Sequence, residues 1–210
     1  MTVNHRWVVN HRWAAAVSAG LVAFALAGCG TDASPAGASP AAASPAAAAP
    51  PEVNGPLPAR PVELPLDGLE PCGLLTSPQL ASLGIPDQGA RAPNSDLLGS
   101  ASCLWAGSLQ PPHGSPQVTA VTKQGVDYFR TPSDQVVDIA GMPALQATSE
   151  DLDPAVHCLV LVDVAAGQTL WVQYSPEGPT SNGSTHEIAC DHARDAARAM
   201  VATLREQLHR

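Results

Sequence analysis

The sequence predicts an α+β fold in which a largely antiparallel sheet carries a short N-terminal helix and a long C-terminal helix packed on it. Runs of β-branched and alternating apolar residues, separated by Gly- and Pro-rich turns, follow one another between positions 101 and 174. An amphipathic pattern with a helical period fills the C-terminus. Four of the five cysteines lie between positions 72 and 190 and predict two disulfides.

The short helix is the first predicted element. Ser77 is a suitable N-cap, Pro78 fits the first helical position, and Gly84 ends the helix. The strands that follow have no helix between them, which favours antiparallel pairing. A turn at 165–167 predicts a short hairpin. The predicted strands are 101–105, 117–122, 135–139, 144–148, 155–164 and 168–174.

The C-terminal helix is predicted to begin at a capping box formed by Ser184 and Glu187, in which hydroxyl and carboxylate satisfy free backbone amides. Beyond it, one face is apolar and the opposite face is charged, so the helix should dock on the sheet. The apolar stripe consists of Cys190, Ala193, Ala197, Met200, Val201, Leu204 and Leu208. The charged face carries Asp191, Arg194, Asp195 and Arg198.

The N-terminus has the features of a lipoprotein signal peptide. Arg6 and Arg12 precede a short uncharged run rich in small residues, which ends in Leu-Ala-Gly before Cys29. We expect residues 1–28 to be removed and Cys29 to receive a diacylglyceryl group. The alternative is an ordinary signal peptide that happens to end in cysteine. Two acyl chains anchor a protein stably, where one is marginal.

Residues 29–65 predict a stalk between the lipidated cysteine and a globular domain at 66–210. Ala-Ser-Pro recurs three times, and the prolines favour an extended, solvated chain with no core. Such a segment would span roughly 30–36 Å as a flexible coil or roughly 110 Å as polyproline II. The predicted location is the extracytoplasmic face of the cell membrane.

Charge and hydropathy exclude two classes of protein. The formal charge is −9 and becomes −11 when residues 1–28, with two arginines and no acids, are removed. A nucleic-acid-binding protein would concentrate Lys and Arg instead. A single continuous apolar stretch argues against a protein with several membrane spans.

The four remaining cysteines allow three pairings. We predict Cys72–Cys103 and Cys158–Cys190, because each pair lies about thirty residues apart with one or two elements between. Cys190 also lies on the apolar stripe that faces the sheet. No Cys-x-x-Cys occurs, so a thioredoxin-like site or zinc knuckle has no support.

Pro-Cys-Gly-Leu-Leu-Thr at 71–76 and Ser-Cys-Leu-Trp at 102–105 resemble segments of a family of uncharacterised actinobacterial lipoproteins. Its members share a lipobox, a low-complexity stalk and a domain with these two cysteine motifs. The later Cys158 and the helix with Cys190 are also similar to that pattern. The resemblance implies a location and an architecture, and carries no activity or cofactor.

No local sequence pattern predicts catalysis or a metal site. Nucleophile elbows, phosphate loops, dinucleotide-binding glycines and His-Glu-x-x-His are absent from the sequence. Acidic and imidazole groups gather at His186, Glu187, Asp191 and His192, but the histidines are six apart and do not converge on a helix. We expect Glu187 to cap the helix and the histidines to be solvated. We therefore predict neither a cofactor nor a metal.

Three further groups of residues bear on binding. Glu150, Asp151 and Asp153 lack calcium-loop spacing, so a solvated acidic turn is expected. Trp105 and Trp171 are candidates for a ligand pocket, with a place in the core as the alternative. The run at 128–130, Tyr-Phe-Arg, is a candidate exposed contact.

These observations predict a non-catalytic, lipid-anchored surface domain that binds a small molecule or an envelope protein. Two alternatives are an extracytoplasmic hydrolase whose site assembles only in the fold, and an accessory subunit of an envelope complex.

Overall fold

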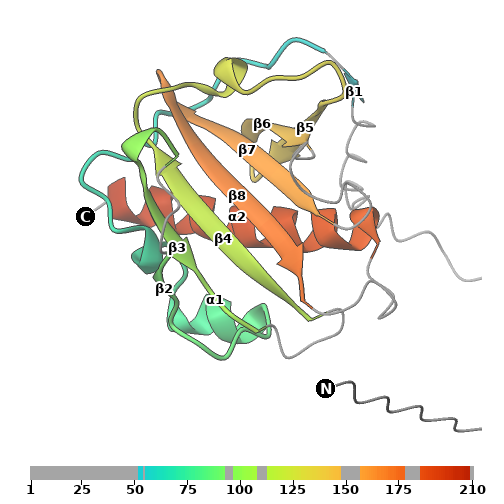
Figure 1. Cartoon of the computed structure of the whole chain (residues 1–210). Coiled ribbons are helices and arrows are strands. Elements are labelled where there is room, and N and C mark those ends of the chain that lie inside the picture. Colours follow the sequence, from blue (N-terminus) through green and yellow to red (C-terminus); the bar gives the residue numbers. More distant parts are fainter. Residues whose placement is uncertain are drawn as a thin grey trace, which may run out of the picture. The chain divides into compact units, whose positions relative to one another are not determined.

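The computed structural model describes residues 52–53, 55–92, 97–107, 113–147, 157–177 and 185–208. The predicted signal peptide, Cys29, most of the predicted stalk and the cluster at 150–153 lie outside the described residues. Eight strands form one sheet in the order β1-β5-β6-β7-β8-β4-β3-β2, and every neighbouring pair is antiparallel (Figure 1). The predicted α+β class is confirmed.

The predicted elements occur in the predicted order, but β1 and β2 were not predicted, and β1 lies within 29–65, which the sequence assigns to the stalk. The strands are β1 (Glu52–Val53), β2 (Ala90–Arg91), β3 (Ala101–Leu104), β4 (Gly114–Val121), β5 (Gln135–Ile139), β6 (Met142–Ala147), β7 (Cys158–Ala165) and β8 (Gln168–Pro176). The helices are α1 (Ser77–Ser82) and α2 (His186–Leu208), with single 3₁₀ turns at Pro71–Leu74, Leu97–Gly99 and Val126–Tyr128.

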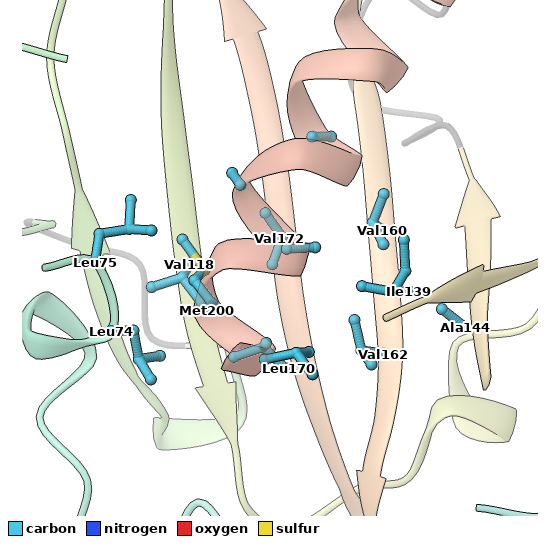
Figure 2. Packing of buried hydrophobic residues seen from close by; sticks show 14 of the residues in the cluster. Leu74, Leu75, Val118, Ile139, Ala144, Val160, Val162, Leu170, Val172 and Met200 are labelled. Atoms are coloured by element: carbon cyan, nitrogen blue, oxygen red, sulfur yellow. The ribbon is translucent and has the colours of Figure 1, made fainter. Parts of the chain in front are cut away.

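Helix α2 packs across one face of the central strands, which we call the inner face (Figure 1). Alternate residues of each strand point to this face, as the period of a strand requires. Val160 on β7 and Val172 on β8 are therefore fully buried, in one cluster with the helix residue Met200 (Figure 2). The apolar stripe of α2 is buried as predicted as far as Leu204, whereas Leu208 is half exposed.

Strand β7 is buried on both faces. Leu161 lies on the outer face, opposite α2. There it forms a second apolar cluster with Leu145 and Val126, which we call the outer cluster. Phe129 and Trp171 pack against this cluster. Burial on both sides explains the continuous apolar run of β7, which is otherwise typical of parallel strands.

Strand β4 begins three residues before the predicted start, because Pro116 is tolerated inside it. The Pro116 carbonyl accepts a hydrogen bond from the Trp105 N–H, so its nitrogen faces the side where β3 has already ended. Pairing with β8 continues through Pro116 to Gly114. Proline is accepted in a strand where no partner needs its missing N–H.

Both helix starts differ from the predicted ones. Thr76 is the N-cap of α1, one residue before the predicted Ser77, and forms a capping box with Gln79. At α2 the Thr185 hydroxyl accepts a hydrogen bond from the Ile188 N–H at 3.2 Å. Ser184 lies outside the described residues.

The segment 60–65, which the sequence assigns to the stalk, packs on the domain instead. Leu64 is buried in the main core, and its N–H donates to the Val164 carbonyl at 2.7 Å. The change in composition at 65 therefore did not mark the start of the domain, and the apolar Leu64 among the prolines was the sign of it. The domain therefore includes residues N-terminal to Leu66.

The two predicted disulfides are confirmed. Cys72–Cys103 links the 3₁₀ turn Pro71–Leu74 to β3, and Cys158–Cys190 links β7 to α2. Disulfides of this kind persist in oxidising compartments and indicate an extracytoplasmic protein. None of the helices in the described part of the chain is long and apolar enough to cross a membrane.

Candidate functional site

The two tryptophans considered for a ligand pocket belong to separate clusters. Trp105 is fully buried in the main core, next to Gly89 and the sulfur of Cys103, and therefore is not a pocket wall. Trp171 lies on the outer face of the sheet and is partly exposed. The structure does not bring these two side chains into one site.

Trp171 is instead the inner end of an aromatic row on the outer face. Its ring contacts Phe129 edge to face, with centroids 5.1 Å apart. Phe129 contacts Tyr128 in the same way at 5.0 Å. Tyr128 is 63% exposed, the highest value among the exposed large hydrophobic side chains of the described residues. We call these three residues the aromatic row.

The aromatic row gathers a large share of the aromatic side chains on one surface. Only five aromatic residues follow Cys29, and the row holds three of them. The short 3₁₀ turn Val126–Tyr128 presents its end: Val126 is buried in the outer cluster, whereas Tyr128 points away from it. The fold thus anchors one end of the row and exposes the other.

A groove opens beside Tyr128, between the 3₁₀ turn and the β7–β8 hairpin. Its volume is about 310 Å³, at the lower end of the range for ligand cavities. Gly125 and Gly167 approach closely there: a Cβ on Gly125 would lie 3.5 Å from the Gly167 Cα. The groove is lined by Leu57, Arg60, Gln124, Gly125, Val126, Asp127, Tyr128, Asp163, Ala166 and Gly167.

A charged network holds one wall of the groove. The Arg60 guanidinium donates to both carboxylate oxygens of Asp163 at 2.6 Å, and to Glu63 at 2.9 and 3.1 Å. The second Glu63 oxygen accepts the Ala166 N–H at 2.9 Å. The hydrogen bonds from Arg60 and from the Ala166 amide lower the pKa of Glu63 below its usual value. The network pins the N-terminal segment to the hairpin.

The groove offers binding contacts and few reactive groups. Among the described residues, its lining includes no Ser, Cys or His that could act as a nucleophile or general base. Of its two described carboxylates, Asp163 forms an ion pair with Arg60, and the exposed Asp127 lies 3.4 Å from Nε of the partly buried Arg130. A largely polar lining beside an exposed tyrosine is typical of the rim of a recognition surface.

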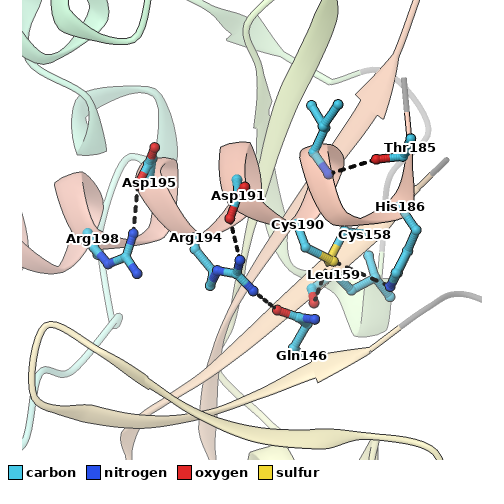
Figure 3. A network of polar contacts seen from close by, with 11 residues as sticks. Gln146, Cys158, Leu159, Thr185, His186, Cys190, Asp191, Arg194, Asp195 and Arg198 are labelled. Atoms are coloured by element: carbon cyan, nitrogen blue, oxygen red, sulfur yellow. Dashed lines mark hydrogen bonds and ion pairs between the residues drawn. A yellow bond between two sulfur atoms is a disulfide. The ribbon is translucent and has the colours of Figure 1, made fainter. Parts of the chain in front are cut away.

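The other predicted cluster, at the start of α2, does not converge as a group. Asp191 pairs with Arg194, and the His192 ring stacks on Tyr174 with centroids 4.7 Å apart. His186 contacts the Cys158–Cys190 disulfide, so neither histidine is simply solvated as expected (Figure 3). Glu187 lies in the first turn of α2.

Two features of the structure were not predicted. The groove requires residues from 57 to 167 to meet, which no local pattern signals. The contact of His186 with Cys190 has a signal, because residues four apart share a helix face. The pairing of Cys190 with Cys158 was predicted, but the approach of His186 to this disulfide was not, because Cys-x-x-Cys spacing does not detect a histidine beside a disulfide.

Comparison with known proteins identifies a family without assigning a function. No curated protein matches the chain, and no solved structure matches it. Residues 24–203 match the family described as "Protein of unknown function (DUF3558)". This match covers most of the chain, including both cysteine motifs and most of α2, and on that extent the chain belongs to the DUF3558 family.

Proposed function

We propose that this protein is a lipid-anchored extracytoplasmic binding protein whose domain recognises an envelope partner through the aromatic row and the adjoining groove. Cys29 is the proposed lipidation site, and the segment rich in Ala, Ser and Pro is the proposed tether. The observation that carries the binding role is the exposure of Tyr128 at the end of an otherwise packed row of rings.

The aromatic row has the composition of a binding hot spot. Tyrosine and tryptophan are enriched where interfaces gain most of their energy, because they bury a large area with few rotatable bonds. The contacts of Phe129 with both neighbours restrict the motion of the row before binding. This preorganisation reduces the entropy lost when a partner docks.

The charge around the groove favours one kind of partner surface. Glu63 and Asp127 are 58% and 83% exposed at its rim, while Arg60 is already held by two carboxylates. A partner that presents apolar and basic side chains would complement this rim, and an acidic one would be repelled. The groove volume suits one or two side chains of a protein better than a large cofactor.

Site-specific photocrosslinking in intact cells tests the proposal. A photoreactive residue replaces Tyr128 in the full chain, and a control chain carries it at Leu208, which is 48% exposed at the end of α2. We expect a light-dependent adduct of defined mass at position 128 and none at 208. Equal labelling at both positions, or none at position 128, would contradict a partner on this surface.

The anchor is tested separately. A Cys29→Ser chain should incorporate no labelled fatty acid, because the sulfur that would carry the acyl chains is gone. A Cys72→Ser/Cys103→Ser chain is the matched control, since it also lacks two cysteines and should be labelled like the parent. Incorporation of label into the Cys29→Ser chain, or none into the parent, would contradict lipidation at Cys29.

A further inference from the structure

The imidazole of His186 lies against the Cys158–Cys190 disulfide (Figure 3). Its Nδ1 is 2.8 Å from the backbone carbonyl oxygen of His157. Because a carbonyl oxygen can only accept, Nδ1 carries the hydrogen, and in the neutral ring Nε2 keeps its lone pair. Nε2 is 3.4 Å from the Cys190 sulfur. In this tautomer, the nitrogen that faces the bridge is therefore the one without a hydrogen.

The three side chains converge from two elements of the fold. His186 and Cys190 are one turn apart on α2, and Cys158 is the first residue of β7. Their ligand atoms all lie within 4.8 Å of one another, and in the described part of the chain no other trio of His, Cys, Asp or Glu meets this condition. Cys72–Cys103 closes a loop of nearly the same length, with a sequence separation of 31 against 32. Among the described residues, no His, Asp or Glu completes a comparable trio with it.

The spacing of sulfur and nitrogen matches that of two ligands on one metal ion. In tetrahedral zinc sites the Zn–S and Zn–N distances are about 2.3 and 2.1 Å, which places the two ligand atoms roughly 3.6 Å apart. The observed separation of Cys190 Sγ and His186 Nε2 is 3.4 Å. Once the S–S bond is cleaved, two thiolates on the same ion would lie roughly 3.8 Å apart, close to sulfur–sulfur van der Waals contact.

The hydrogen bond to His157 is the support that metal-bound histidines usually have. Such a histidine donates its second ring N–H to a carboxylate or backbone carbonyl, which fixes the tautomer and the ring orientation. In this structure the support is in place while the cysteines are oxidised. The disulfide bond does not require this hydrogen bond. The His186–His157 contact is therefore an observation separate from the proximity of the three ligand atoms.

We propose that reduction of Cys158–Cys190 creates a site in which Cys158, His186 and Cys190 bind one Zn²⁺ ion, with water as the fourth ligand. A dithiol reductant supplies two electrons and two protons, giving two thiols and its own cyclic disulfide. Binding of Zn²⁺ then releases both thiol protons. The inference is independent of the proposed partner surface, which lies on the opposite face of the sheet.

Cobalt and zinc titration of the full chain tests the site. The membrane-extracted protein is reduced with dithiothreitol without oxygen, freed of reductant and titrated with Co²⁺. We expect one equivalent to give the thiolate-to-cobalt charge-transfer absorption, and Zn²⁺ to displace it. The oxidised protein should give no such band. Absence of the band from reduced protein that retains its far-ultraviolet circular dichroism would overturn the proposal.

Variants identify the ligands. His186→Gln should weaken Zn²⁺ binding about tenfold or more, and Cys158→Ser/Cys190→Ser should abolish it. Cys72→Ser/Cys103→Ser should bind Zn²⁺ like the parent. Equal affinity in the His186→Gln chain, or loss of binding only in the Cys72→Ser/Cys103→Ser chain, would refute the assignment. Should reduction unfold the domain, Zn²⁺ is expected to restore its circular dichroism, and failure to do so would also refute it.

Discussion

The Arg60 guanidinium donates to both carboxylate oxygens of Asp163 at 2.6 Å, although the two residues are 103 positions apart in the sequence. Their side chains are only 22% and 14% exposed, so the pair is shielded from solvent more than a typical surface ion pair. Together with the Leu64 backbone bond, it fastens the start of the domain to the β7–β8 hairpin.

Replacing Arg60 with alanine should therefore destabilise the domain by about 1–2 kcal/mol, because Asp163 is left partly buried without its partner. Arg198→Ala is the matched control, since its ion pair with Asp195 is about half exposed on both sides, and should cost less than about 0.5 kcal/mol. Urea unfolding of both variants measures the difference. Equal losses would mean that the Arg60 pair does not restrain the segment.

The same network makes stability depend on pH in one direction. The pKa of Glu63 is lowered from its usual 4.5 by Arg60 and the Ala166 amide, so its contribution is present above pH 4.5 and is lost as pH falls through the lower, folded value. We expect the difference in unfolding free energy between the parent and Glu63→Gln to be constant near neutrality and to shrink on acidification. A difference that grows below pH 4.5 would contradict this sign.

Gly89 should tolerate no side chain, for two reasons that can be separated. Its φ of +77° favours glycine, and a Cβ would lie 2.5 Å from Nε1 of the buried Trp105 and 2.8 Å from the Cys103 sulfur. Gly68 has a similar φ of +70° with no atom within 4 Å. Gly68→Ala should cost about 1 kcal/mol from backbone strain alone, and Gly89→Ala a further 1–3 kcal/mol from overpacking. Thermal unfolding that ranks them equally would exclude the steric contribution.

The elements that the sequence predicted well are those in which local pattern and tertiary packing agree. Strand β5 has the predicted bounds, and the stripe of α2 from Cys190 to Leu204 is buried as its period requires. The cysteine pairing followed from the same helix period, because it placed Cys190 towards the sheet. The predicted bounds are wrong at Pro116, a residue typical of turns that lies inside β4, and at Leu64, a buried residue in a segment of linker composition.

The candidate site was less predictable because it depends on segments that meet only in the fold. Arg60 and Asp163 carry no local signal of pairing, and the groove they help to line has no sequence motif. The run at 128–130 was singled out as an exposed contact, and Tyr128 is exposed. The extension of the aromatic row from this run to Trp171 could not be predicted, because it depends on the sheet register. The register places Trp171 beside Leu161 on the outer face.

The two disulfides should contribute about equally to stability. Their loops differ by one residue, and the loop-closure entropy of such a loop corresponds to roughly 3–4 kcal/mol. Cys72→Ala/Cys103→Ala and Cys158→Ala/Cys190→Ala should therefore show similar losses in urea unfolding. A much larger loss for one pair would indicate that packing of its sulfurs, rather than restriction of the unfolded chain, provides the stabilisation.

Substitutions in the aromatic row should distinguish the residue that stabilises the fold from the residue proposed to contact a partner. Tyr128 is 63% exposed and has one ring contact, so Tyr128→Ala should change the unfolding free energy by less than about 0.5 kcal/mol. Phe129 contacts both neighbouring rings and packs on the outer cluster, so Phe129→Ala should cost about 1–3 kcal/mol. Urea unfolding compares them. A large loss at Tyr128 would show that its ring stabilises the fold, and its exposure would then no longer argue for a partner.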